Sequence, residues 1–377
     1  MKKLKNLNEW IEQAESIIKK VKKGEKICLV FHDDSDGCCS AALFSILIHN
    51  LIDDYPVLFP IVGIENINSQ FLRRMQNFNP DFVFVFDISA KPEDLDDLKG
   101  FILDHHIFFE IESRNSMPYL NPHHFEKDDE KAPPTSYMVY LILKKFFPHE
   151  KVAWVAGIGI TEDHRVEICK DVFKKIREET PELLKVERID QKNVEKSLFG
   201  ELGDMVRSGR MLKGVEGAKT ATLALVECKD RPDKLINGLT QHSLALRRFY
   251  DKVSYETQNY ISDVEKNARF YKKGKVIVYE QQHTKLRGLT SFIADKIRQK
   301  YPEWISYVIN KEYGGKAKIS IRLEQEKRDE NLVSIIEKIK EKIPTIRGGG
   351  HKAAIGVVLN YEDVYEFERE FLKLLNR

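Results

Sequence analysis

Three consecutive residues that can bind metal ions or transfer protons, Asp104, His105 and His106, follow directly on the apolar run Gly100–Leu103. A short apolar run bounded by polar residues is typical of a buried strand in a parallel sheet. Ligands of open α/β sheets bind at the carboxyl ends of such strands. Taken alone, the triplet fits either a catalytic centre at a strand end or a polar loop that contains two histidines.

Three further apolar segments, two resembling strands and one a helix, end in residues of the same kind. Carboxylates brought together at strand ends repel one another and cost stability. Cations held between them remove that cost, so the repeated pattern indicates a metal site. The residues are His32, Asp34 and Asp36 after the first segment, Asp87 after the second and Asp163 after the third.

In their order and spacing these motifs resemble the DHH phosphoesterase superfamily. The first motif of that family, H-x-D-x-D-G, is similar to residues 32–37, and its D-H-H triplet is similar to residues 104–106. Asp87 and Asp163 match the single aspartates of its second and fourth motifs. Residues 347–351, Arg-Gly-Gly-Gly-His, resemble the G-G-G-H motif of the DHH-associated C-terminal domain.

Alternating strand and helix patterns, together with this resemblance, imply an α/β fold. We expect a doubly wound parallel-sheet DHH catalytic domain at residues 1–170 and a helical insertion or connector at 171–270. A smaller DHH-associated domain with a mixed α/β sheet is expected at 271–377, where 305–310 and 316–323 form a hairpin and the glycine segment forms a loop.

The resemblance implies a site for two divalent metal ions, one held by His32, Asp34 and Asp87 and the other by Asp36, Asp87, His105 and Asp163. Imidazole with carboxylates suits Mn²⁺, and Mg²⁺ is a possible substitute. Two ions about 4 Å apart can activate a bridging water and neutralise the charge of an in-line phosphoryl displacement.

Two residues of the triplet are catalytic candidates rather than metal ligands. His106 resembles the family residue that faces the substrate phosphate, and Asp104 is expected to orient a histidine by a hydrogen bond. The alternative for His106 is a supporting histidine behind the ligands. Asp33 is expected in a solvated loop, and His123 and His124 at the surface.

The glycine segment is the main candidate for substrate binding, because glycines let the main chain approach an anion closely. Cationic side chains beside it favour phosphate binding over a plain turn. We expect the substrate in a cleft between the domains. The candidate residues, some by resemblance to the family's S-x-R element, are Arg287, Ser320, Arg322, Arg347, Gly348, Gly349, Gly350 and His351.

Composition narrows the class of protein. With 61 basic and 59 acidic residues, the chain does not have the character of a polycation that wraps duplex nucleic acid. No apolar run approaches the roughly 20 residues that span a bilayer, and the N-terminus lacks the apolar core of a secretion signal. The five cysteines form no C-x-x-C pair. We therefore expect a cytoplasmic protein without a membrane partner.

The resemblance implies a RecJ-like exonuclease, including the archaeal members of that group, that degrades single-stranded DNA or RNA to mononucleotides and acts in DNA repair. One alternative is an oligoribonuclease (nanoRNase) or a cyclic-dinucleotide phosphodiesterase with the same metal chemistry. Another is a non-catalytic replication scaffold, against which the intact motifs argue. The helical insertion could contact a single-stranded nucleic acid along its length, or it could bind a replication or repair partner.

Overall fold

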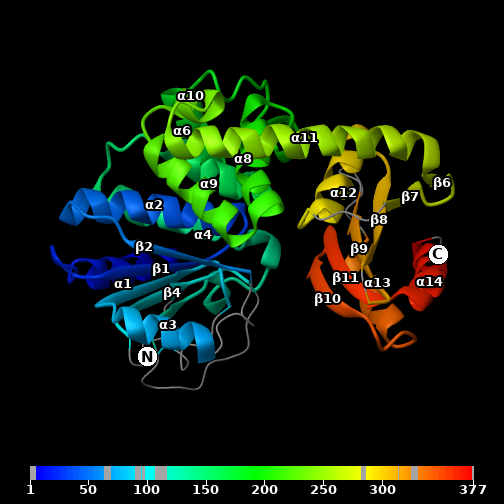
Figure 1. Ribbon diagram of the computed structural model, residues 1–377, viewed down its shortest axis with the longest axis horizontal. Helices are drawn as coiled ribbons and strands as arrows, with labels where there is room; N and C mark the ends of the chain where they lie inside the picture. Colours follow the sequence, from blue (N-terminus) through cyan, green and yellow to red (C-terminus); the bar gives the residue numbers. More distant parts are fainter. Residues whose placement is uncertain are drawn as a thin grey trace. The chain divides into compact units, whose positions relative to one another are not determined.

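The computed structural model describes residues 6–62, 69–89, 95, 98–106, 117–281, 286–312, 314–323 and 330–375 (Figure 1). Contacts divide the chain into two compact units, Met1–Asp251 and Lys252–Arg377, and helix α11 (Gln241–Asn267) contributes residues to both. The helices between 170 and 251 share the hydrophobic core of the first unit. The three-domain division expected from the sequence stays a prediction.

A five-stranded parallel sheet, sheet A, forms the centre of the first unit. Its strand order is doubly wound, and it places the carboxyl ends of the first, third and fourth strands side by side at one edge. From one side of the sheet to the other, the strands are β2 (Val57–Ile61), β1 (Ile27–His32), β3 (Phe82–Phe86), β4 (Gly100–Leu103) and β5 (Tyr119–Leu120).

Helices cover both faces of sheet A, which explains why its central strands are apolar throughout. On one face, Phe44 packs against Phe84 with ring centroids 4.6 Å apart, and on the other, Val85 joins a cluster with Met75. Figure 1 shows the corresponding helices, α2 and α3, on opposite sides of the sheet. Before α11, the helices of the first unit are α1 (Leu7–Ile18), α2 (Ser35–Ile52), α3 (Ser69–Phe78), α4 (Thr135–Phe146), α5 (Ala153–Glu162), α6 (Lys170–Glu179), α7 (Gln191–Glu195), α8 (Leu198–Lys213), α9 (Val215–Glu227) and α10 (Pro232–Asn237), with short 3₁₀ turns at Pro122–His124 and Asp129–Lys131.

Helix α2 is the one helix in the described part of the chain with the length and composition to cross a membrane. Most of it is buried in the core of the first unit, where Cys38 and Cys39 lie among its apolar residues. Its apolar character therefore has a sufficient explanation in the packing of this unit.

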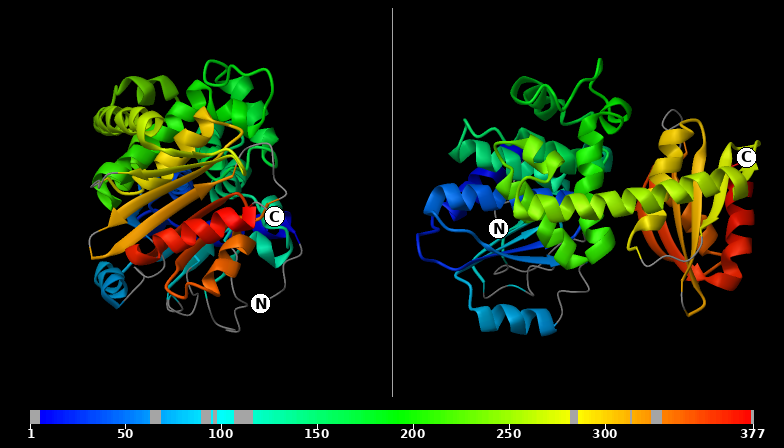
Figure 2. Two further views of the ribbon diagram at one scale, coloured as in Figure 1. Left: turned by 90° about the vertical axis from the view of Figure 1, so that its right-hand side faces the viewer. Right: turned by 45° about the horizontal axis from the view of Figure 1, so that its top comes forward.

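A six-stranded mixed sheet, sheet B, forms the centre of the second unit, so the predicted fold class is confirmed. Helix α12 (Leu289–Lys300) covers one face, and α13 (Leu332–Lys340) and α14 (Val364–Leu375) cover the other (Figure 2). In spatial order the strands are β10 (Arg347–His351), β11 (Ala354–Asn360), β9 (Lys316–Arg322), β8 (Ile305–Glu312), β7 (Val276–Gln281) and β6 (Arg269–Tyr271), and a 3₁₀ turn lies at Tyr361–Asp363.

Two local expectations for the second unit have different outcomes. The hairpin is present, since β8 and β9 pair antiparallel around Gly314 and Gly315, which both have positive φ. The glycine segment is strand β10 rather than a loop, because its backbone pairs antiparallel with β11 from Arg347 to His351. A glycine strand needs a partner that supplies backbone hydrogen bonds, and β11 provides them.

Gly37 shows how closely a helix can approach a strand in this fold. It lies in the first turn of α2, and its backbone N–H donates to the side chain of Asp34, 3.0 Å away. A Cβ at this position would lie 2.1 Å from the carbonyl oxygen of His32. The glycine therefore allows α2 to begin directly against the end of β1.

We expect Gly37→Ala to lower the free energy of unfolding by about 1–3 kcal/mol, because the added methyl group meets backbone that must shift. Gly356→Ala is the matched control, since a Cβ there would have no atom within 4 Å. Denaturant unfolding of both variants checks the prediction. A Gly37→Ala protein as stable as the control would mean that close packing does not explain this glycine.

Candidate metal centre

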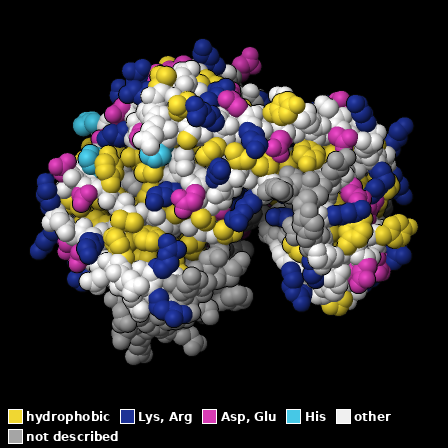
Figure 3. All heavy atoms as spheres, in the orientation of Figure 1, with side chains coloured by type: hydrophobic (Ala, Val, Ile, Leu, Met, Phe, Trp, Pro, Cys, Tyr) yellow, Lys and Arg dark blue, Asp and Glu magenta, His cyan; other side chains and the backbone are white. Residues whose placement is uncertain are grey.

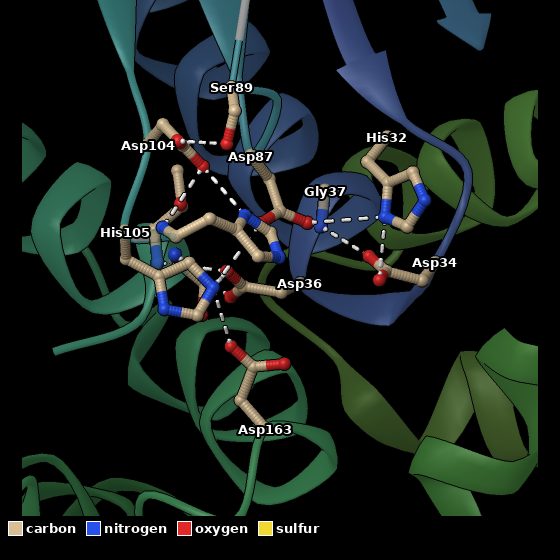
Figure 4. A network of polar contacts seen from close by, with 12 residues as sticks. His32, Asp34, Asp36, Gly37, Asp87, Ser89, Asp104, His105 and Asp163 are labelled. Carbon is tan, nitrogen blue, oxygen red and sulfur yellow. Dashed lines mark hydrogen bonds and ion pairs between the residues drawn. The ribbon is translucent and has the colours of Figure 1, made fainter. Parts of the chain in front are cut away.

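The end of β1 and the start of α2 bring one group of candidate ligands together. His32 is the last residue of β1, and Asp34 caps α2. His32 Nδ1 lies 2.7 Å from Asp34 Oδ2 and 3.6 Å from Oδ2 of Asp87, which follows β3 (Figure 4). The three side chains could hold one metal ion between them.

A second group gathers around His105, which follows β4 and is buried. Its Nε2 lies 3.4 Å from Asp87 Oδ1, 3.1 Å from Asp163 Oδ2 and 4.0 Å from Asp36 Oδ2. Asp163 follows the last residue of α5, and Asp36 is in the first turn of α2. Four elements distant in sequence thus deliver these side chains to one place, as Figure 4 shows.

Asp87 lies between the two groups, with Oδ2 toward His32 and Oδ1 toward His105. Its φ of 60° is in the left-handed region, which aspartate tolerates better than most residues, and its backbone N–H donates to Leu103 across the sheet. Both carboxylate oxygens are buried, and neither has a hydrogen-bond partner in the described part of the chain.

Buried carboxylate oxygens without hydrogen-bond donors are costly unless a cation supplies the missing partner. Asp163 Oδ2 is a third such atom. Carboxylates combined with imidazoles form a donor set suited to Mn²⁺. The six predicted ligands are therefore close together and fit divalent metal ions in both position and chemistry.

The charges in this cluster oppose one another strongly. Burial, together with the charges of Asp163 and Asp87, raises the pKa of Asp36 well above its usual range. Burial alone would lower the pKa of His105, but the charge of Asp163, whose Oδ2 lies 3.1 Å from His105 Nε2, raises it well above the usual value. Without a bound cation, protons therefore compensate part of the negative charge of the cluster.

Asp36 is fixed by the start of α4. Its two carboxylate oxygens accept hydrogen bonds from the backbone N–H groups of Thr135, 2.8 Å away, and Ser136, 2.9 Å away. The positive end of the α4 dipole lies at the same place. These two backbone hydrogen bonds hold the carboxylate of Asp36 near His105.

Asp104 is fully buried and organises a hydrogen-bond network. Its Oδ1 lies 2.8 Å from Nδ1 of His106, and its Oδ2 accepts from Ser89, 2.9 Å away, and from the Tyr119 hydroxyl, 2.7 Å away. Asn121 adds a donor to the same oxygen and a second to the His106 carbonyl. The sequence analysis did not single out Ser89, Tyr119 or Asn121; Tyr119 begins β5, and Asn121 directly follows it.

His106 is 41% exposed at its side chain, unlike its neighbours. Burial would lower its pKa, but the Asp104 charge and hydrogen bond raise it to about 9. The ring is therefore held with Nδ1 toward Asp104 and carries positive charge near neutral pH. It also lies 3.8 Å from Asp87 Oδ1, so geometry alone also allows it to bind a metal ion.

Two predictions about neighbouring residues are wrong. Asp33 is not solvated but 5% exposed, and its carboxylate forms an ion pair with Arg210 of α8 at 3.3 Å. His123 is buried rather than on the surface, because it lies in a 3₁₀ turn where its Nδ1 contacts the Glu126 carbonyl. His124 is half-buried.

Several predicted substrate residues share one face of sheet B. Directly opposed residues on paired strands point to the same face, and the register opposes Ser320 to Gly356, which is opposed to Gly349. The neighbouring row contains Arg322, and the row on the other side contains Arg347.

These residues differ in whether they are exposed and whether they already have a partner in the protein. Ser320 is buried, and Arg322 Nε donates to Asp295 at 2.6 Å. Arg347 and Arg287 are exposed, as are Gly348, Gly349 and Gly350. The side chain of His351 lies outside the described part of the chain. The expected cleft between the domains stays a prediction.

The comparisons with known proteins agree with this architecture. Residues 273–377 match the family model described as the DHHA1 domain. No curated protein sequence matches the chain.

Three solved structures illustrate the fold. The DHH domain of PF0399, described as a member of the s1p family of ribosomal proteins, has a TM-score of 0.71 at 15% identity, covering 98% of this chain and 91% of that one. RecJ from Thermus thermophilus in complex with Mn²⁺ has a TM-score of 0.67 at 15% identity, covering 98% of this chain and 54% of that one. CDC45 from Entamoeba histolytica has a TM-score of 0.56 at 10% identity, covering 98% and 99%.

At these identities the structural likeness concerns the fold. Residues 273–377 match the DHHA1 domain, and the chain as a whole shares its fold with the DHH domain of PF0399 and with RecJ from Thermus thermophilus.

Proposed function

We propose that this chain is a metal-dependent phosphodiesterase that hydrolyses single-stranded DNA or RNA from one end and releases mononucleotides. The observation that carries the proposal is the position of Asp87. Its two buried oxygens, which lack hydrogen-bond partners in the described part of the chain, face different groups of candidate ligands. A carboxylate in this position suits a bridge between two metal ions.

These contacts support the ligand assignment that the family resemblance implies. Mn²⁺ fits the mixed imidazole and carboxylate donors best, and Mg²⁺ is the weaker alternative. When bound, a metal pair supplies an activated water and neutralises charge on the reacting phosphate. His32, Asp34 and Asp87 would hold one ion, and Asp36, Asp87, His105 and Asp163 the other.

His106 and Asp104 have complementary tasks in this proposal. Asp104 is fully buried, so it acts by positioning His106 and maintaining its charge. The exposed part of the His106 ring would donate a hydrogen bond to a non-bridging oxygen of the scissile phosphate. Such a donor is most effective when the surrounding protein has fixed its direction beforehand.

A polymer substrate is favoured by the second unit, whose sheet B contains the candidate phosphate-binding residues, separate in sequence from the candidate metal ligands. Several phosphates held away from the reacting one would contribute binding energy to the reaction. On the face drawn in Figure 3, basic and acidic side chains are interspersed, in keeping with 61 basic and 59 acidic residues. This argues for contacts to a few phosphates of the nucleic acid rather than for an extended basic surface.

A non-catalytic scaffold for replication proteins is the second candidate function. The observation that favours it is the fold shared with CDC45 from Entamoeba histolytica. Against it stands the retained set of six candidate ligands, which a scaffold does not require. A replication or repair partner could still bind the helices between residues 170 and 251, whether or not the chain is catalytic.

Asp87→Asn should reduce hydrolysis of a small chromogenic phosphodiester by roughly a hundredfold or more, because the neutral amide cannot bridge two cations. A chelator should have the same effect on the wild type, and Mn²⁺ should restore activity at least as well as Mg²⁺. Initial rates measured after metal removal and readdition check this. More than a tenth of wild-type activity in the variant would contradict the two-metal assignment.

Thermal melting separates this effect from misfolding. In chelator, Asp87→Asn should melt at the wild-type temperature or higher, because one buried repulsive charge is gone. Added Mn²⁺ should raise the wild-type Tm more than that of the variant. Asp54→Asn, a change at an exposed carboxylate, is the matched control and should behave as the wild type in both assays.

Asp104→Asn should lower kcat through His106, so its effect should not add to that of His106→Gln. Residues that act as a unit are non-additive in a double-mutant cycle. We therefore expect the double variant to be no slower than His106→Gln alone. Independent, multiplying losses in kcat would show that Asp104 does not act by positioning His106.

Substrate length separates an exonuclease from an enzyme for very short substrates. For single strands, the logarithm of affinity should fall with the logarithm of salt concentration by about 0.7 per neutralised phosphate. We expect kcat/KM to rise from dinucleotides to strands of about ten nucleotides and then level off. The measurement uses lengths from two to twenty at two salt concentrations, with a cyclic dinucleotide alongside. Maximal activity at two or three nucleotides, or on the cyclic compound, would favour the alternative enzyme.

A further inference from the structure

Two buried carboxamides in the second unit have hydrogen-bonding groups that the described part of the chain does not satisfy. Gln281, the last residue of β7, is 2% exposed, and neither its Oε1 nor its Nε2 has a partner there. Asn310 lies beside it in the register of β8, is 8% exposed, and has an unpartnered Oδ1. Apolar side chains of similar size would avoid this cost, so the two amides point to a ligand that supplies partners.

Their position in the fold supports that interpretation. Strands β7 and β8 are parallel and are connected through α12, which forms a β–α–β unit. Gln281 and Asn310 lie at the carboxyl ends of the two strands, where ligands of such units bind. Helix α12 begins after Gly288, which is in the left-handed conformation, and among the described residues no side chain caps its first N–H groups.

The amides also share a face of sheet B with the candidate substrate residues. Asn310 is directly opposite Lys318 in β9, and the row continues through β11 to Arg347 in β10. Ser320 lies in the adjacent row, and diagonal neighbours of this kind are roughly 7–8 Å apart. A nucleotide bound through its phosphate to the Ser320 row could therefore place its base near the amides.

We propose that Gln281 and Asn310 bind the base of a substrate nucleotide and select adenine. This inference rests on the proposed function, and it adds a base preference to it. A carboxamide presents a donor beside an acceptor, which matches the N6 amino group and N7 of adenine. Because the amides are buried, a base that does not pair with them leaves their polar groups without partners, and buried polar groups discriminate strongly for this reason.

Calorimetric titration of the full chain in chelator, with AMP, UMP and inorganic phosphate as separate probes, tests the inference. We expect AMP to bind at least about tenfold more tightly than UMP, and phosphate more weakly than AMP. Gln281→Met and Asn310→Leu, made separately, should each reduce the AMP-to-UMP affinity ratio toward one. Gln299→Met, a change at a glutamine of α12 that accepts from Lys296, is the matched control and should keep the wild-type ratio.

Thermal melting of the same proteins provides a second readout. Since both polar atoms of the Gln281 amide and Oδ1 of Asn310 lack partners in the described residues, apolar replacements of the two residues should not lower Tm. A lower Tm with an unchanged affinity ratio would give the amides a structural role and overturn the inference. Equal affinities of AMP and UMP for the wild type would also overturn it, even if both variants failed to fold.

Hydrolysis of end-labelled single strands with Mn²⁺, measured on the same wild-type preparation, distinguishes this inference from the proposed function. Hydrolysis together with equal AMP and UMP affinities overturns the base preference alone. Selective AMP binding without hydrolysis overturns the phosphodiesterase proposal and leaves a purine-binding site in the second unit.

Discussion

Repulsion between carboxylates is the constraint on which the first unit depends. Asp34, Asp36, Asp87 and Asp163 approach one another at one end of sheet A, where burial removes most of the water that would screen their charges. Their positions require the parallel strand order, the close approach that Gly37 allows and the left-handed backbone of Asp87. A fold that holds this arrangement against its repulsion is suited to binding cations, and we interpret the centre in that way.

Much of this centre could be predicted from the sequence, because parallel strands place their carboxyl ends at a common edge. Apolar runs before His32, Asp87 and the triplet beginning at Asp104 identified three strand ends without any knowledge of how those strands pair. The resemblance to a known family then supplied the order of the remaining motifs, including Asp163 after a helix. The alternation of strand and helix patterns, together with the same resemblance, also predicted the doubly wound sheet and the mixed C-terminal sheet.

What the sequence did not reveal depends on contacts between distant segments. Asp33 was expected in solvent because its partner, Arg210, comes from α8, whose position no local pattern indicates. The glycine segment became a strand because β11 offers it hydrogen bonds. Gln281 and Asn310 look like ordinary strand-end residues until the register places them together and their buried amides show polar atoms without partners in the described part of the chain. The pattern of apolar residues along the sequence identifies helices and strands. The features above depend on how those helices and strands are arranged in space.

Anomalous diffraction at the manganese edge, from crystals grown with Mn²⁺, tests most directly the proposal that Asp87 bridges two metal ions. The account predicts two manganese peaks about 4 Å apart, one on each side of the Asp87 carboxylate. His32 and Asp34 should contact one ion, and His105 and Asp163 the other. A single peak, or two peaks that do not share Asp87, would contradict it.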